Sequence, residues 1–377
     1  MQSVIFLLLF LLMEAAPVSS QEAERCFQEG VAKNFDLAIF YCTQVIEAGS
    51  LPEKRLAIAF SNRGIAYSEK KDYNRAIQDF SQAIRLDPTN AIVFNNRGNA
   101  YRDKQDHDSA ILDYSQAIRL DPSYVVAFNN RGNAYRNKQD YDKAIQDYSQ
   151  AIRLNPNYAL AYNNRGYTHF DKKDYERAIQ DFNLAIRLDP KYTVAYNNRG
   201  NAYLSKNEYS RAIEDYRVVL QLDPKNSGAY ANRAHARFFL GEFSSAVPDF
   251  AKAAELQSSY PYYPIWLYLA EARSGRNARR GLEDLARRLD LSKWPGPVVE
   301  FFLERTLEGS LLRAAEDPDP KKRIEQVCEA NFFAAQARLI RGEVEPALSL
   351  LRAAQRYCPP SFIEFIGAQA ELMKLGY

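Results

Sequence analysis

Histidine, cysteine, methionine and tryptophan are scarce in this sequence of 377 residues, with three, four, three and two copies. His107, His169 and His235 fall in different segments, at unlike positions of the repeats described below, so they do not readily converge on one site. The motifs CxxC, HExxH and GxSxG are absent, and so is a glycine-rich phosphate loop. We therefore expect no enzyme, no metal site and no cofactor.

A surplus of one charge sign is also missing, because 49 Lys and Arg residues nearly balance 47 Asp and Glu residues, for a formal charge of +2. Nucleic-acid binders usually carry a clear basic excess, since phosphate neutralisation supplies most of their affinity. General nucleic-acid binding is therefore disfavoured. The 46% of hydrophobic residues suffices for a folded core and is not typical of disorder.

The longest apolar run, residues 4–13, is too short to span a bilayer but matches the apolar core of an export signal. Small residues follow, so we expect a signal peptide over residues 1–20, cleaved before Gln21, and a periplasmic or secreted protein with no integral membrane segment. Cys26 lies too far downstream for a lipoprotein signal. An uncleaved anchor or a misplaced start is the alternative, because no Lys or Arg precedes the run.

An internal period of 34 residues dominates the middle of the chain. It is carried by glycine at 64, 98, 132, 166 and 200, by proline at 88, 122, 156, 190 and 224, and by alanine at 76, 110, 144, 178, 212 and 246. Apolar residues recur at steps of three and four, a polar turn lies mid-unit, and proline ends the second half. Each unit is therefore predicted to be a helical hairpin that buries its apolar face only against its neighbours.

These glycine, alanine, proline and aromatic positions resemble the tetratricopeptide repeat, and six units match it over residues 57–260. The resemblance implies an all-α fold, a right-handed α-solenoid of helix-turn-helix hairpins. A degenerate hairpin is expected within residues 21–56. Residues 261–377 are expected to form a C-terminal helical region, with helices near 264–274, 280–289 and 297–303, a repeat-like hairpin at 328–361 and a capping helix at about 361–375.

The tail carries a second resemblance. Trp294, the Val298 to Phe301 step, Glu329 to Phe333, Phe362 to Glu364 and Glu371-Leu372 together resemble NlpI-type periplasmic repeat proteins. That family implies an adaptor, often dimeric, on the periplasmic side of the outer membrane, which docks peptidoglycan hydrolases to a protease. The chain departs from it in lacking the lipid-anchor cysteine.

The four cysteines test the hairpin register. We number the residues of each repeat so that Gly64 is position 8. In an antiparallel hairpin, two residues on opposite helices lie at the same height along the hairpin when their position numbers add to a fixed constant. Cys26 and Cys42 have positions that add to 32, as do those of Cys328 and Cys358. We predict these two disulfides, each worth on the order of 3 kcal/mol in so short a loop. Four buried free thiols are the alternative.

Two charged ladders repeat with the hairpins. Position 7 is arginine at 63, 97, 131, 165, 199 and 233, and position 23 is aspartate at 79, 113, 147, 181, 215 and 249. Their positions add to 30, so each arginine can reach its own aspartate across the hairpin. We predict structural ion pairs Arg63–Asp79, Arg97–Asp113, Arg131–Asp147, Arg165–Asp181, Arg199–Asp215 and Arg233–Asp249, because guanidinium and carboxylate match as forks.

Asparagine forms a third ladder at position 6, despite its poor helix propensity: Asn62, Asn96, Asn130, Asn164, Asn198 and Asn232. Position 5 is also asparagine at 95, 129, 163 and 197, and position 9 at Asn99, Asn133 and Asn201. An amide can donate to and accept from a peptide backbone, and the ladder resembles that of O-GlcNAc transferases. Hydrogen bonds between neighbouring helices are the alternative. A carboxylate clamp is doubtful, because positions 2 and 6 lack Lys and Arg.

Aliphatic residues at position 2, namely Ile58, Ile92, Val126, Leu160 and Val194, lie beside the ladder, either in a groove or in packing between units. Arg102 and Arg136 add positive charge there or remain solvated. We predict an exported adaptor without catalytic function that binds a partner protein or extended peptide in the concave groove. A self-assembling module such as a homodimer, or an envelope glycan binder, are the alternatives.

Overall fold

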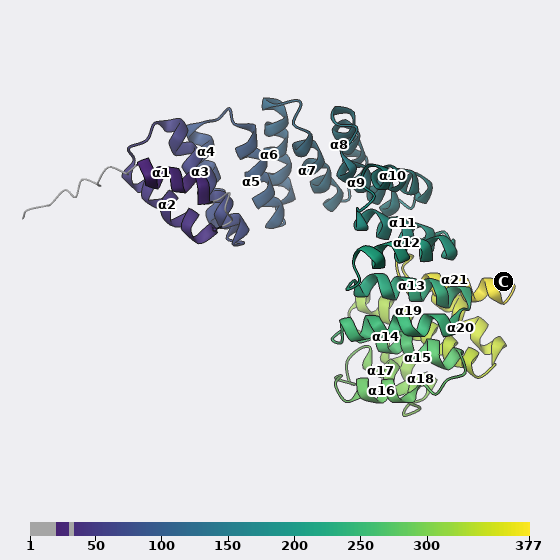
Figure 1. The fold of residues 1–377 in the computed structure, drawn as a ribbon. Coiled ribbons are helices and arrows are strands. Elements are labelled where there is room, and N and C mark those ends of the chain that lie inside the picture. Colours follow the sequence, from purple (N-terminus) through teal and green to yellow (C-terminus); the bar gives the residue numbers. More distant parts are fainter. Residues whose placement is uncertain (1–19, 30–33) are drawn as a thin grey trace, which may run out of the picture. The chain divides into compact units, whose positions relative to one another are not determined.

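The computed structural model describes residues 20–29 and 34–377, so nearly all of the expected signal peptide (1–20) lies outside the described residues. The described residues form helices and no strand (Figure 1). The helices are α1 (Ser20–Glu29), α2 (Phe35–Ala48), α3 (Glu53–Glu69), α4 (Tyr73–Leu86), α5 (Ala91–Asp103), α6 (His107–Leu120), α7 (Val125–Asn137), α8 (Tyr141–Leu154), α9 (Ala159–Asp171), α10 (Tyr175–Leu188), α11 (Thr193–Ser205), α12 (Tyr209–Leu222), α13 (Ser227–Leu240), α14 (Phe243–Leu256), α15 (Tyr262–Arg273), α16 (Arg279–Ala286), α17 (Gly296–Phe302), α18 (Glu308–Ala314), α19 (Pro320–Ile340), α20 (Val344–Tyr357) and α21 (Ile363–Lys374). The all-α class is therefore as expected.

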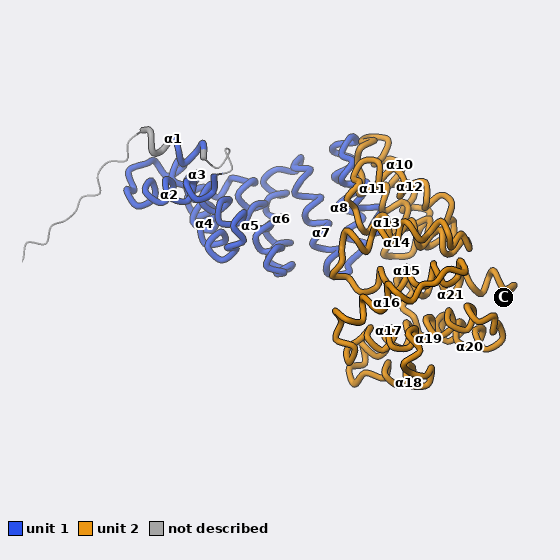
Figure 2. The backbone as a smooth tube through the Cα atoms, turned by 60° about the horizontal axis from the view of Figure 1, so that its bottom comes forward, with its two compact units in different colours: residues 1–168 blue, residues 169–377 orange. Residues whose placement is uncertain are grey.

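The chain divides into two compact units, residues 1–168 and 169–377, with the boundary inside α9 (Figure 2). In unit 1, α1/α2 packs against α3/α4, α3/α4 against α5/α6, and α5/α6 against α7/α8. In unit 2, the hairpins α11/α12 and α13/α14 continue the series before the irregular tail.

Each regular hairpin turns through a residue in the left-handed region. Lys71, Gln105 and Gln139 have φ values of 62°, 65° and 61°, and Gly241 occupies the same repeat position with φ 85°. In the hairpins of Lys71, Gln105 and Gln139 an aspartate follows and caps the second helix; the Asp140 side chain, for example, accepts the backbone N–H of Lys143. Both features satisfy the free ends of the helix backbone and so set where each helix begins.

The repeated glycines allow an aromatic ring to lie against the first helix. A Cβ built on Gly132 would lie 2.7 Å from the Tyr148 ring, and on Gly64 2.8 Å from the Phe80 ring. Tyr148 is fully buried. The glycine therefore provides space for the ring that fills its own hairpin.

We expect Gly132→Val to lower the free energy of unfolding by about 1–3 kcal/mol, because the added methyl groups overlap the buried Tyr148 ring. Chemical denaturation measures the change. Gly281→Val is the matched control, since a Cβ on Gly281 in α16 meets nothing within 4 Å. Equal losses in both variants would contradict a steric cause.

The tail of unit 2 packs around aromatic residues, among them Phe238, Phe250, Trp266, Phe332 and Phe333. Helices α15, α16, α17 and α21 lie within a few residues of their expected bounds. The structure differs from the sequence-based expectation in two places. Helix α18 was not expected, and α19 begins at Pro320, eight residues before the expected hairpin. The Asp319 side chain accepts the backbone N–H groups of Lys321 and Lys322, so an Asp-Pro cap starts this helix early.

Both expected cysteine pairs are bonded. Cys26 and Cys42 join α1 to α2 with an S–S distance of 2.10 Å, and Cys328 joins α19 to Cys358 just after α20 at 2.12 Å. No helix in the described part of the chain has both the length and the apolar character needed to cross a membrane.

Candidate functional site

The charged ladder ties the two helices of a hairpin together. The Arg131 Nε and Nη2 atoms donate to the two carboxylate oxygens of Asp147 at 2.8 and 2.7 Å. The same fork joins Arg63 to Asp79, Arg97 to Asp113, Arg199 to Asp215 and Arg233 to Asp249, with distances of 2.6–2.9 Å. Arg165 and Asp181 belong to different units, so their pairing stays a prediction.

The remaining guanidinium nitrogen bonds the preceding repeat. Nη1 of Arg97 donates to Ser81 Oγ, and Nη1 of Arg131 to Ser115 Oγ, both at 3.0 Å. The Arg131 guanidinium also lies 5.7 Å from the centre of the Phe128 ring, a cation–π contact. This ladder is consequently occupied by the scaffold, and its nitrogens are not offered to a ligand.

Four of the position-6 asparagines use their amide nitrogens between neighbouring repeats. Asn130 Nδ2 donates to the Oδ1 atoms of Asn95 and Asn99 at 3.0 and 3.2 Å, and Asn164 Nδ2 donates to Asn129 Oδ1 at 3.0 Å. Asn232 Nδ2 donates to Asn201 Oδ1 at 3.3 Å in unit 2, Asn62 Nδ2 to the Cys26 carbonyl at 3.4 Å, and Asn198 is buried. These bonds follow the alternative reading of the ladder, in which amides join neighbouring helices.

The position-9 asparagines differ because a buried tyrosine holds the amide oxygen. The hydroxyl groups of Tyr114, Tyr148 and Tyr216 donate to Oδ1 of Asn99, Asn133 and Asn201 at 2.8, 2.7 and 2.7 Å. The three asparagines are half-buried, and their Nδ2 groups donate to no other described residue. These amide nitrogens can therefore donate to a peptide carbonyl.

The position-2 aliphatics are exposed rather than packed between repeats. Their exposed fractions run from 39% to 57% for Ile58, Ile92, Val126, Leu160 and Val194. Four of them belong to unit 1, where they place one apolar side chain on each successive first helix. We call the surface formed by Ile58, Ile92, Val126 and Leu160 with Asn99 and Asn133 the first-helix surface.

Family models of the tetratricopeptide repeat match the chain at residues 57–90, 98–139, 132–173, 159–192, 193–226 and 227–260. Together these segments cover more than half of the sequence. The chain belongs to the tetratricopeptide repeat family. Membership supports a protein-binding scaffold.

Solved structures of other proteins share the fold. A repeat protein from Parabacteroides merdae is 20% identical, with 66% of this chain and 99% of that chain covered and a TM-score of 0.52. The C-terminal part of a repeat protein from Cytophaga hutchinsonii is 18% identical, with 65% and 99% covered and a TM-score of 0.52. The APC/C hetero-tetramer Cut9–Hcn1 is 18% identical, with 67% and 49% covered and a TM-score of 0.53. The similarity of the tail to NlpI-type proteins stays a prediction.

Arg102 and Arg136, the two basic residues expected beside the asparagine ladder, both have partners within the protein. Arg102 pairs with Asp103 at 2.8 Å, and Arg136 lies over the Tyr167 ring at 4.6 Å. Arg102 also lines a hollow of about 360 Å³ with Asn96 and Asn99, on the face of α3 and α5. The structure thus brings three of the expected groove residues together.

The three histidines lie on different helices, His107 on α6, His169 on α9 and His235 on α13. Within residues 20–29 and 34–377, no cluster of His, Cys, Asp and Glu side chains is suited to hold a metal ion.

Sequence reasoning missed a second hollow, which lies between the last regular repeat and the tail and is lined by residues that include Tyr262, Trp266, Glu329 and Glu364. The aromatic run YPYYPIW at 260–266 was its available signal. The acidic residues that complete it come from helices far along the chain, so spacing alone did not connect them.

Proposed function

We propose that this protein is a non-catalytic, exported adaptor whose first-helix surface holds an extended segment of a partner protein. The exposed position-2 row carries the proposal. Solvated aliphatic side chains that recur at one position of successive helices favour contact with another polypeptide.

The chemistry of the surface suits a peptide main chain. Asn99 and Asn133 direct amide donors from adjacent first helices, because Tyr114 and Tyr148 fix their oxygens. Each donor can bond a backbone carbonyl, and the aliphatic residues beside them contact alternate side chains. Such a surface recognises the backbone and the apolar side chains of a peptide more than its charged side chains.

Export is proposed from the two disulfides, which use all four cysteines and are typical of oxidising compartments. Envelope hydrolases and proteases are the partner classes that the NlpI-type resemblance favours.

We expect the double variant Ile92→Ser and Val126→Ser to bind selected peptides about tenfold more weakly, because two apolar contacts with the peptide are lost. The ligands are peptides recovered from a random phage-displayed library on the immobilised full chain, and fluorescence anisotropy measures their affinity. The melting temperature should stay nearly unchanged, since both side chains are exposed in the free protein.

Leu112→Ser is the matched control, because Leu112 is 72% exposed but lies on α6, a second helix. It should alter affinity less than about twofold. The proposal fails if the library yields no binder, or if the control weakens binding as much as the double variant.

A further inference from the structure

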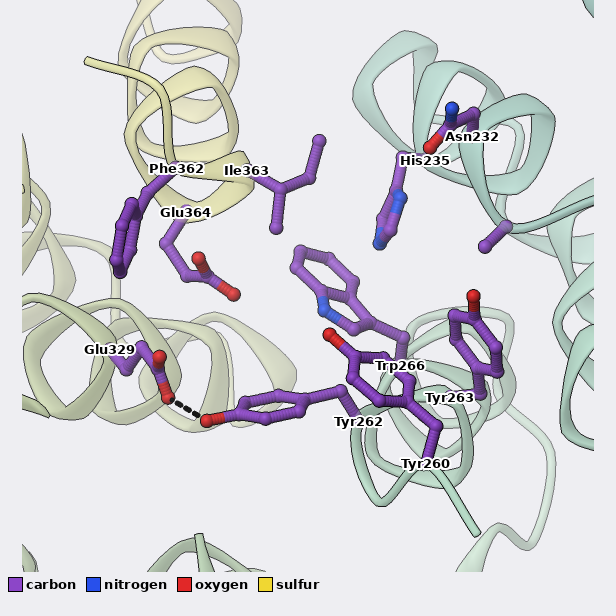
Figure 3. A pocket seen from close by; sticks show the side chains of 11 residues that line it. Asn232, His235, Tyr260, Tyr262, Tyr263, Trp266, Glu329, Phe362, Ile363 and Glu364 are labelled. Atoms are coloured by element: carbon purple, nitrogen blue, oxygen red, sulfur yellow. Dashed lines mark hydrogen bonds between the residues drawn. The ribbon is translucent and has the colours of Figure 1, made fainter. Parts of the chain in front are cut away.

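The hollow in unit 2 lies between α13, α15, α19 and the start of α21 and encloses about 380 Å³ (Figure 3). Its lining is aromatic and acidic: Tyr260, Tyr262, Tyr263, Trp266, Glu329 and Glu364. None of the described residues that line it is Lys or Arg. Two carboxyl groups therefore lie beside a space to which the described residues contribute no ammonium or guanidinium group.

Both carboxyl groups are buried, with Glu329 8% and Glu364 4% exposed. One oxygen of Glu329, Oε2, accepts hydrogen bonds from the Tyr262 hydroxyl at 2.8 Å and from Trp294 Nε1 at 2.7 Å. Its other oxygen can still accept. Within the described part of the chain, no other side chain donates a hydrogen bond to Glu364, and Figure 3 shows its carboxyl group directed into the hollow.

Burial disfavours the ionised form of both carboxyl groups, because no Lys or Arg among the residues that line the hollow balances their charge. It raises the pKa of Glu364 to about 8, with the Glu329 charge adding to the rise, and it raises the pKa of Glu329 to about 7. A cation placed between them would stabilise both carboxylates.

His235 is a further buried polar side chain that lines the hollow. The side chain is 7% exposed and lines the hollow, and neither ring nitrogen has a hydrogen-bond partner among the described residues. Its ring lies edge-on to Trp266, 4.5 Å between centres. An unpartnered buried imidazole is costly unless something in the hollow bonds it.

We propose that this hollow binds a primary ammonium group at the end of an alkyl chain, as found in a lysine side chain. Aromatic faces attract a cation, and the free carboxyl oxygens accept its N–H groups. A quaternary ammonium has no N–H to donate, and an uncharged ligand leaves the acidic pair without a counter-charge. The site is separate from the first-helix surface, so either proposal can fail without the other.

The test uses the full chain with its disulfides intact and follows its two tryptophan indole N–H signals by NMR. n-Butylammonium should shift the signals of Trp266 and Trp294 saturably, with a Kd on the order of 1 mM, as suits a ligand of so few atoms. Tetramethylammonium and n-butanol should bind at least about tenfold more weakly. Absence of a saturable shift up to about 50 mM n-butylammonium, or equal binding of either comparison compound, would overturn the proposal.

Glu364→Gln should weaken n-butylammonium binding at least about tenfold, because the bound cation favours the ionised form of Glu364 and glutamine cannot ionise. Glu345→Gln removes the same charge from an exposed position on α20, outside the hollow lining, and should change binding less than about twofold. Unchanged binding by Glu364→Gln, with dispersed indole signals showing a folded protein, also overturns the proposal.

A capped Gly-Gly-Lys-Gly-Gly peptide distinguishes the two sources of the ammonium group. Tighter binding of the peptide than of n-butylammonium would identify the ligand as a lysine side chain of a polypeptide partner. Equal or weaker binding of the peptide would identify the ligand as a free alkylamine.

Discussion

Replacing Arg131 by methionine is expected to lower the free energy of unfolding by about 3–5 kcal/mol, because it leaves a buried carboxylate without its partner. Asp147 is 5% exposed and receives two hydrogen bonds from Arg131. The substitution also removes the bond to Ser115 that ties this repeat to the preceding one. Urea denaturation followed by circular dichroism measures the loss.

The loss should depend on pH. Burial raises the pKa of the Asp147 carboxyl group, and the hydrogen bonds from Arg131 oppose that rise. Without the arginine, the carboxyl group becomes neutral more readily, so the variant should lose less stability at about pH 4 than at about pH 8.

Two further variants distinguish the effect of an unpaired buried carboxylate from a non-specific loss of stability. Arg131→Met combined with Asp147→Leu removes both charges and should recover most of the loss. Lys143→Met breaks the exposed pair Lys143–Asp140 and should leave stability unchanged. A double variant no more stable than the single one would show that the ladder acts through packing rather than charge.

Glu364→Gln is expected to raise stability by about 3 kcal/mol at pH 9 and to leave it nearly unchanged at pH 5. Burial raises the pKa of Glu364 to about 8, far above its ordinary value of 4.5. The folded protein therefore holds a proton there that the unfolded chain has released at neutral pH. Stability is complete below the unfolded pKa and falls as pH rises through about 8, whereas glutamine has no proton to lose.

Urea denaturation at both pH values checks this expectation. Glu345→Gln serves as the control, since Glu345 is exposed on α20 and its removal should give the same small change at both pH values. An equal effect of Glu364→Gln at pH 5 and pH 9 would mean that ionisation of the Glu364 carboxyl group does not destabilise the folded protein.

Local sequence was enough to predict the regular hairpins. The 34-residue period, the caps such as Asp140 and the position-8 glycines recur because each repeat meets neighbours of the same shape. The arginine–aspartate pairing and both cysteine pairs follow from hairpin register alone, because antiparallel helices bring fixed position sums together. The early start of α19 at Pro320 was readable in principle from its Asp-Pro cap.

What the asparagines do was decided only by tertiary structure. The same amide can bond a ligand or a neighbouring helix, and Asn130 reaches Asn95 and Asn99 only because successive first helices pack closely. Exposure of the position-2 row depends on that spacing too.

The amino-acid sequence by itself therefore determined the repeat, its hairpins and the contacts inside each hairpin, since these are local and recur with every unit. Tertiary structure alone decided which polar groups remain free, and it built the acidic hollow by bringing Tyr262 against Glu329, 67 residues apart. Contacts that occur once, between distant segments of the tail, have no period and leave no repeated trace in the sequence.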